Sequence, residues 1–132
     1  MSLDITPVTV TGTWWRHLPA GGDPAYRSEP PASGRWQRGD TVAALYLAGD
    51  EDTCWAEWYR RLADDAITPL QALPRDLWRY AVALDGVAAL DTDERLAAVG
   101  LRAPRPSRAD WSAYQAVGER LWHDGYAGIL FA

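Results

Sequence analysis

The chain of 132 residues is long enough to bury a hydrophobic core, and we expect residues 1–132 to form a single domain. Its 18 acidic and 13 basic residues give a net charge of −5, which argues against nonspecific binding to nucleic acid. The single cysteine excludes a disulfide within the chain, the two histidines leave no metal-ligand cluster of ordinary spacing, and no apolar stretch approaches the roughly 20 residues of a membrane span.

The N-terminal part of the sequence predicts one strand followed by a long loop. Thr, Val and Trp dominate Val8–Arg16, a composition typical of strands, and alternation places Arg16 and His17 on opposite faces. From Pro19 to Ser33 the sequence is rich in Gly, Pro, Ala and Ser. Because loops of this length are uncommon inside a compact domain, we expect a flexible loop with a functional role.

The next segment supplies a cation and aromatic rings close together. Arg35 and Trp36 follow a glycine in a predicted turn, and the apolar run Val42–Ala48 predicts a strand that contains Tyr46. A guanidinium can hold a phosphate group through two hydrogen bonds, and an aromatic face can stack on a flat ring. These residues therefore indicate a site for an anionic ligand that carries a ring.

A helix is predicted at Glu51–Ala63, with Asp50 as its N-cap. Glu57 lies beside the apolar stripe of this helix, and two interpretations are open for it. In the first, its carboxylate takes part in catalysis. In the second, it forms a surface ion pair with Arg60 or Arg61, since residues three and four apart are neighbours on a helix. Spacing alone favours the ion pair.

The second half of the sequence predicts a β-hairpin and a final strand. Alternation predicts strands at Asp76–Leu84 and Val87–Leu90, joined by a tight turn at Asp85-Gly86. The apolar segment Gly128–Ala132 predicts the last strand.

Two further helices are expected between these strands. Thr92 is the predicted N-cap of a short helix, Asp93–Val99, which a glycine closes. The last helix is predicted to run from Ser107 to about His123, because Ser107 begins a capping box. Ser112 and Gln115 are three residues apart and share one face of it.

The chemistry indicated by these residues is electrostatic. The sequence contains no Gly-x-Ser-x-Gly elbow, no Walker loop and no His-Glu-x-x-His pair. Cleavage of the nicotinamide–ribose bond of NAD suits this set, because nicotinamide leaves as a neutral ring while positive charge grows on the ribose. Glu57 would stabilise that charge, and Arg16 or Arg35 would hold the pyrophosphate. Tyr46 or Trp36 would stack on the nicotinamide.

Three motifs occur in an order and spacing that resembles the RES domain family, and the resemblance covers Trp15 to Ala132. They are Gly34-Arg35-Trp36-Gln37, Ala44-Leu45-Tyr46-Leu47-Ala48 with Glu57 ten residues after Leu47, and Asp110-Trp111-Ser112 followed by Gln115-Ala116-Val117-Gly118. The family supplies the toxins of RES–Xre toxin–antitoxin pairs. The resemblance implies an α+β domain with mixed or antiparallel sheets and flanking helices, similar to ADP-ribosyltransferases of the diphtheria-toxin kind. It also implies an enzyme that degrades NAD by hydrolysis or phosphorolysis.

The resemblance implies roles for individual residues as well. It makes Glu57 and Arg16 catalytic, which reverses the preference for a surface ion pair, and it makes NAD a substrate rather than a cofactor. The substrate-binding residues are then Arg35, Trp36, Tyr46, His17, Ser112 and Gln115. The sequence departs from the family pattern at His17, where Tyr commonly stands, and at Gln37, where Asn is usual.

The partners expected for this chain are NAD and a protein. The resemblance implies an Xre-like antitoxin whose C-terminal part blocks the pocket, and we expect no direct contact with nucleic acid or membrane. The cysteine usage and the lack of a signal-peptide pattern predict a cytoplasmic protein. The family pattern continues beyond the equivalent of Ala132, and a missing last strand would expose a sheet edge that favours a homo-oligomer.

Two alternatives to NAD degradation stay open. The same pocket could transfer ADP-ribose to a protein. The altered residues His17 and Gln37 also motivate a catalytically silent module that binds NAD or a partner.

Overall fold

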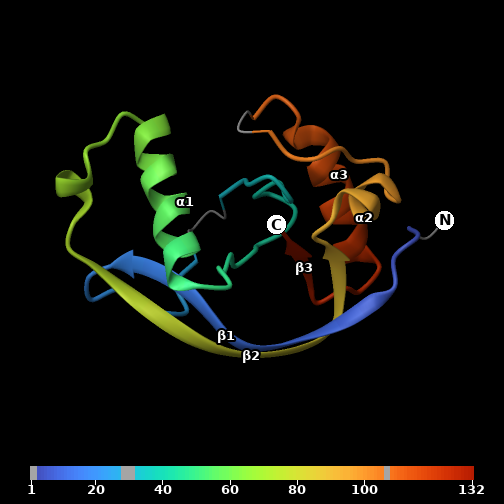
Figure 1. Cartoon of the computed structure of the whole chain (residues 1–132), viewed down its shortest axis with the longest axis horizontal. Coiled ribbons are helices and arrows are strands. Elements are labelled where there is room, and N and C mark those ends of the chain that lie inside the picture. Colours follow the sequence, from blue (N-terminus) through green and yellow to red (C-terminus); the bar gives the residue numbers. More distant parts are fainter. Residues whose placement is uncertain (1–2, 28–31, 106–107) are drawn as a thin grey trace. The chain divides into compact units, whose positions relative to one another are not determined.

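The computed structural model describes residues 3–27, 32–105 and 108–132. In chain order the elements are β1 (Pro7–Pro19), α1 (Glu51–Asp64), a short 3-10 helix (Pro69–Ala72), β2 (Arg75–Leu90), α2 (Asp93–Ala97), α3 (Trp111–His123) and β3 (Gly128–Phe131) (Figure 1). This combination of a sheet with separate helices confirms the predicted α+β class.

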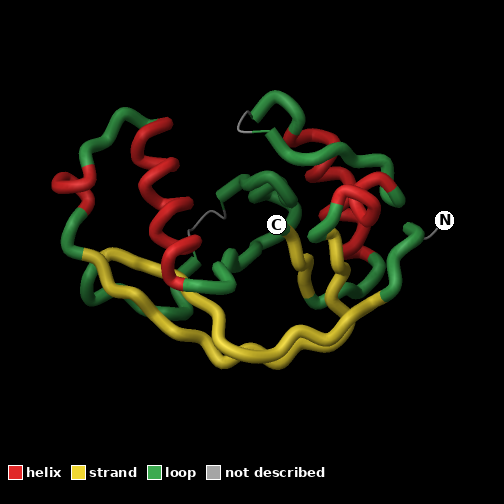
Figure 2. Tube along the Cα trace, viewed as in Figure 1, coloured by secondary structure: helices red, strands yellow, loops and turns green. Residues whose placement is uncertain are grey.

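The strands form one mixed sheet in the order β1-β2-β3. Figure 2 shows β1 and β2 side by side, and the arrows of Figure 1 show that they run in opposite directions. β3 is parallel to the end of β2, with Val87 opposite Gly128 and Leu90 opposite Phe131. The predicted mixed sheet is therefore confirmed, and β3 forms one edge of it among the described strands.

The chain divides into two compact units, each with its own buried residues. The first unit comprises Met1–Val10, Arg27–Ala44 and Ala83–Ala132. Its core is built from β2, α2, α3 and the turn Gly34–Gln37, which carries Trp36. The buried members are Trp36, Ala88, Leu90, Leu96, Leu101, Tyr114, Val117 and Leu121.

The second unit comprises Thr11–Tyr26 and Leu45–Val82 and contains α1. One face of α1 is buried because apolar residues recur at a spacing close to one helical turn. The buried residues of this face are Cys54, Trp58 and Leu62. Leu18 at the end of β1 and Ala48 ahead of α1 are buried in the same unit.

The three predicted helices are present in the described residues. The Asp50 carboxylate accepts a hydrogen bond from the Thr53 N–H at 2.7 Å, which is the predicted N-cap of α1. The Thr92 hydroxyl accepts from the Arg95 N–H at 3.2 Å ahead of α2. α3 ends at His123 as predicted but begins only at Trp111, so the predicted start at Ser107 is wrong. Residues 108–110 form a bend and a turn instead, and Ser107 itself lies outside the described residues.

The predicted strand at Val42–Ala48 is wrong. Residues 42–47 have no regular secondary structure, and Ala48 forms only an isolated bridge to Trp15 of β1. An apolar run of this length does not specify which strand will pair with it. Here the pairing stops after the two backbone hydrogen bonds of the bridge, each 2.8 Å long.

The predicted hairpin at Asp85-Gly86 is also wrong. β2 continues through both residues, because its last part pairs with β3 instead of folding back on its own beginning. Gly86 adopts a φ of 68° within the strand, a conformation that glycine tolerates and that fits an irregularity in a strand as well as a turn.

The predicted loop at Pro19–Ser33 is described in part. After β1, the Gly22 N–H donates to the Pro19 carbonyl and the Tyr26 N–H donates to the Asp23 carbonyl, each at 2.9 Å. Residues 28–31 lie outside the described residues, so the functional role of the loop stays a prediction. In the described parts of the chain, no helix combines the length and the apolar character needed to cross a membrane.

Candidate functional site

Half of the predicted site residues belong to the second unit. β1 carries Arg16 and His17, and α1 carries Glu57. The bridge between Trp15 and Ala48 holds the chain ahead of α1 beside β1. The segment with Tyr46 is therefore fixed next to the strand that carries the cation and the imidazole.

Glu57 is exposed on α1. In the part of the chain that the structure describes, its carboxylate forms no ion pair with Arg60 or Arg61. Desolvation raises the pKa of the Glu57 carboxyl above its ordinary value, while the charges of Arg61 and Arg60 act in the opposite direction. Because the side chain is exposed, water limits this effect. Glu57 is therefore not held by a neighbouring guanidinium and is available to a ligand.

His17 is held against two tryptophans of α1. Its ring stacks on Trp55, with the centroids 5.2 Å apart and the planes at 5°, and it meets Trp58 edge-on at 5.2 Å. Arg75, the first residue of β2, donates its Nε–H to Nδ1 of His17 at 2.8 Å. These contacts fix the imidazole in one orientation.

The same surroundings keep His17 neutral near physiological pH. Burial, together with the smaller effects of the positive charges of Arg75, Arg61 and Arg16, lowers the pKa of His17 from 6.5 to about 4. A neutral imidazole at this position can stack and can donate one hydrogen bond.

Arg16 contacts the chain that follows β1. Its Nη1 donates to the Pro24 carbonyl at 3.4 Å, and the Tyr80 hydroxyl donates to the same oxygen. A guanidinium has five N–H donors, so this long contact leaves Arg16 with capacity to bind an anion.

Arg35 lies in the first unit, against the beginning of α3. Its Nη2 donates to the Arg105 carbonyl at 3.0 Å, and its guanidinium carbon lies 5.3 Å from the centroid of the Tyr114 ring. Nη1 forms an ion pair with Oδ1 of Asp110 at 3.8 Å, a separation that is too long for a hydrogen bond. Both atoms, Nη1 of Arg35 and Oδ1 of Asp110, are buried, and neither has a hydrogen-bond partner among the described residues. Nη1 is therefore a donor of the kind that a phosphate oxygen satisfies.

Trp36 is buried in the core of the first unit. Its side chain is 5% exposed, and its ring meets Tyr114 edge-on at 5.2 Å and Phe131 at 5.8 Å. Trp36, which follows Arg35 in the sequence, thus anchors this turn in the core.

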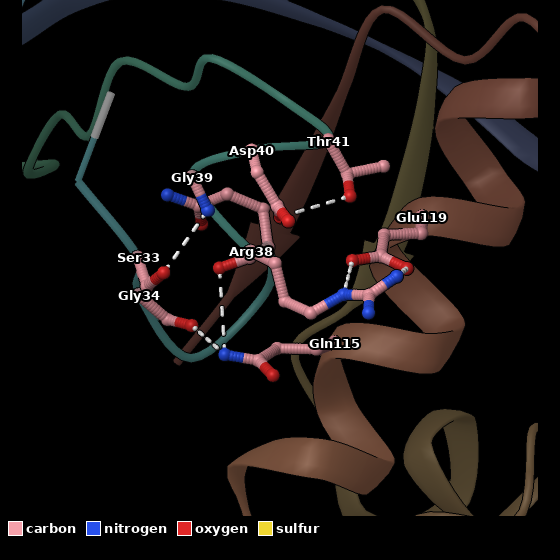
Figure 3. A network of polar contacts seen from close by, with 9 residues as sticks. Ser33, Gly34, Arg38, Gly39, Asp40, Thr41, Gln115 and Glu119 are labelled. Carbon is pink, nitrogen blue, oxygen red and sulfur yellow. Dashed lines mark hydrogen bonds and ion pairs between the residues drawn. The ribbon is translucent and has the colours of Figure 1, made fainter. Parts of the chain in front are cut away.

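Gln115 and Glu119 of α3 bind the backbone and side chains of the same turn (Figure 3). The Gln115 amide donates to the Gly34 carbonyl at 2.9 Å and to the Gln37 carbonyl at 3.4 Å. Arg38 donates to both carboxylate oxygens of Glu119, at 2.7 and 2.9 Å. Since Gln115 and Glu119 are one helical turn apart, a single face of α3 holds the turn.

Ser112 also lies on α3, within its first turn, and is exposed. Its described surroundings give no sign of the ligand that it would bind.

No cluster of three or more His, Cys, Asp or Glu side chains that could hold a metal ion occurs within residues 3–27, 32–105 and 108–132.

The family model of the RES domain matches this chain over residues 11–132. The chain belongs to the RES domain family. It is similar to a crystal structure of the M. tuberculosis MbcT-MbcA toxin-antitoxin complex, with a TM-score of 0.78 and 26% sequence identity. The similarity covers 95% of this chain and 70% of the matched chain in that crystal structure. Among curated proteins, none matches the sequence.

In this RES domain the predicted site residues form two sets, one in each unit. The second unit contains Arg16, His17, Tyr46 and Glu57, and the first unit contains Arg35, Trp36, Ser112 and Gln115. Their assignment to catalysis and substrate binding stays a prediction. Sequence reasoning missed Arg75, because its partner His17 is 58 residues away and no local pattern links the two.

Proposed function

We propose that this RES domain is the toxin of a toxin–antitoxin pair and that it degrades NAD by cleaving the nicotinamide–ribose bond. The observation that carries the toxin assignment is the similarity to the MbcT-MbcA toxin-antitoxin complex, which extends over 95% of the chain. Cleavage of NAD is inferred from membership of the RES domain family and from the residues below. The proposed reaction is hydrolysis or phosphorolysis, and its proposed place is the cytoplasm.

The state of Glu57 supports this chemistry. As the bond to nicotinamide breaks, positive charge develops on the ribose, and a carboxylate nearby stabilises it most when no other cation neutralises that carboxylate. Glu57 is exposed and makes no ion pair with the arginines one turn further along α1, within the described residues. It is the group in the second unit that we assign to this role.

The two arginines support binding of an anionic substrate. Arg35 has a buried Nη1 donor without a hydrogen bond among the described residues, and Arg16 makes one long contact to a carbonyl. Each can bind a phosphate oxygen of NAD. Tyr46 is 40% exposed, so part of its ring can contact the nicotinamide.

For Trp36 and Gln115 the geometry favours an indirect role in substrate binding, in which neither side chain contacts NAD. Trp36 is buried, and the Gln115 amide is used by two carbonyls of the turn. Both residues fix the backbone on which Arg35 is carried, so their loss would misplace a guanidinium that binds substrate.

The products of a reaction with purified protein test the proposal. NAD is incubated with the protein, with and without inorganic phosphate, and the products are identified by mass spectrometry. Free ADP-ribose indicates hydrolysis, and an ADP-ribose phosphate that appears only with phosphate indicates phosphorolysis. A stable ADP-ribose adduct on proteins of a lysate indicates protein ADP-ribosylation instead. Binding of NAD in calorimetry without any product contradicts an enzyme and supports a silent binding module.

The proposed protein partner is an antitoxin with an Xre-like DNA-binding part. The product of a neighbouring reading frame should form a complex with this chain and abolish NAD loss at equal molar amounts. A homo-oligomer through the edge strand β3 is tested separately by size-exclusion chromatography with light scattering.

A further inference from the structure

Arg75 determines which nitrogen of His17 carries the proton. Its Nε–H donates to Nδ1 of His17 at 2.8 Å. A guanidinium has only donors, so Nδ1 must be the acceptor and cannot carry a hydrogen. The neutral imidazole then carries its proton on Nε2.

The second partner of Arg75 holds it in place. The guanidinium carbon lies 5.0 Å from the centroid of the Trp58 ring, at a distance typical of a cation–π contact. Trp58 is 5% exposed and also meets the edge of His17. The imidazole and the guanidinium therefore share one buried tryptophan, and neither can turn away without losing a contact.

The charges around His17 oppose a second proton on it. Positive groups face it from each element packed against it, namely Arg16 of β1, Arg61 of α1 and Arg75 of β2. Burial raises the pKa of the Cys54 thiol on α1, which disfavours a thiolate there. No anion among these groups favours a charged imidazole.

We propose that Arg75 is a positioning residue that fixes His17 as a neutral Nε2–H donor for an oxygen acceptor of the substrate. The identity of this acceptor, a hydroxyl or carboxamide oxygen of NAD, rests on the proposed function. The state of the imidazole does not, because it follows from contacts within the second unit.

Nitrogen-15 NMR of the imidazole in the full chain tests the state of His17 directly. At neutral pH, Nε2 of His17 should show the shift of a protonated nitrogen and Nδ1 that of an unprotonated acceptor. The ring should resist protonation until well below pH 6.5, its ordinary pKa. A proton on Nδ1, or titration near the ordinary value, overturns the proposal even if no variant can be made.

Three variants separate the hydrogen bond from the charge. Arg75→Met removes both, so the pKa of His17 should rise toward 6.5 and both neutral tautomers should appear. Arg75→Gln keeps an N–H donor without charge, so the tautomer should persist while the pKa rises in part. Arg79→Met removes an exposed arginine of the same strand and should change neither property. An unchanged tautomer and pKa in Arg75→Met overturns the proposal.

Turnover distinguishes failure of this proposal from failure of the proposed function. If the protein cleaves NAD, Arg75→Met should raise KM for NAD several-fold with a smaller change in kcat, and Arg79→Met should match the wild type. Equal kinetics for all three proteins contradict a role of His17 in binding substrate. Absence of NAD cleavage in the wild type contradicts the proposed function and leaves the NMR result to decide the role of Arg75.

Discussion

Gly118 of α3 approaches the backbone of Trp36 so closely that a Cβ on Gly118 would lie 1.9 Å from the Trp36 carbonyl oxygen. The carbonyl belongs to backbone that cannot move aside as a flexible side chain can. α3 and the turn that carries Arg35 therefore pack at a distance that only glycine permits.

Substitution of Gly118 by alanine tests this contact. Gly118→Ala should destabilise the chain by about 2 kcal/mol, because overpacking costs about 3 kcal/mol and the better helix propensity of Ala returns about 1 kcal/mol. The free energy of unfolding from urea titration measures the effect. Gly128→Ala is the matched control, because a Cβ there meets no atom within 4 Å. Equal stability of both variants would show that the turn does not pack on α3 as described.

Gln115 offers a second prediction about the same turn. Gln115→Glu keeps the size of the side chain but replaces the amide donor by a carboxylate that faces two carbonyl oxygens, so both hydrogen bonds are lost. We expect a loss of about 1–3 kcal/mol in stability and a rise in KM for NAD through misplacement of Arg35. Gln71→Glu, an exposed glutamine whose side-chain oxygen accepts a hydrogen bond, is the control that should retain near wild-type values. A normal KM in Gln115→Glu would separate Gln115 from the function of Arg35.

The low pKa of His17 predicts how stability depends on pH. Between pH 6.5 and about 4 the unfolded chain binds a proton at His17 that the folded chain does not. The stability contributed by neutral His17 is therefore complete above pH 6.5 and is lost as the pH falls toward 4. Urea unfolding across this range should show a weaker pH dependence in His17→Gln than in His123→Gln. Identical curves for the two variants would mean that His17 titrates normally.

The raised pKa of Glu57 predicts the acid limb of the activity profile. If the Glu57 carboxylate must be ionised for NAD cleavage, kcat/KM should fall on the acid side with a midpoint above 4.5, the ordinary value for glutamate. The pH dependence of kcat/KM measures this midpoint, because kcat/KM reports groups of the free enzyme. A midpoint below the ordinary value would contradict the described surroundings of Glu57.

The helices could be predicted from the sequence because their signals are local. Asp50 and Thr92 each stand immediately before a helix, and each side chain accepts a hydrogen bond from an N–H three residues further on. Such signals depend only on residues within one turn. The α+β class follows from the helices together with the alternating pattern of β2.

The strand errors have a different cause, since strand pairing is not local. In isolation, the apolar pattern of Val42–Ala48 fits a strand and the Asp85-Gly86 pair fits a tight turn. Their actual state is decided by partners elsewhere, namely β1 for Ala48 and β3 for the end of β2. No spacing within either segment carries that information.

The candidate site shows the same limit. Motif order pointed to Arg35 and Gln115, but Gln115 lies 81 residues from Gly34, whose carbonyl accepts its amide hydrogen. The sequence motifs therefore could not distinguish a residue that contacts substrate from one that holds the turn. The contact between Arg75 and His17 was invisible for the same reason.

NAD loss catalysed by Glu57→Gln tests whether the Glu57 carboxylate drives cleavage of the nicotinamide–ribose bond. This change keeps the size of the side chain and removes only its charge, and Glu51→Gln, an exposed glutamate in the first turn of the same helix, is the matched control. We predict that Glu51→Gln consumes NAD like the wild type and that Glu57→Gln loses at least about a hundredfold in kcat while keeping its unfolding midpoint, as expected when one electrostatic group is removed. Wild-type turnover in a folded Glu57→Gln protein would contradict the account.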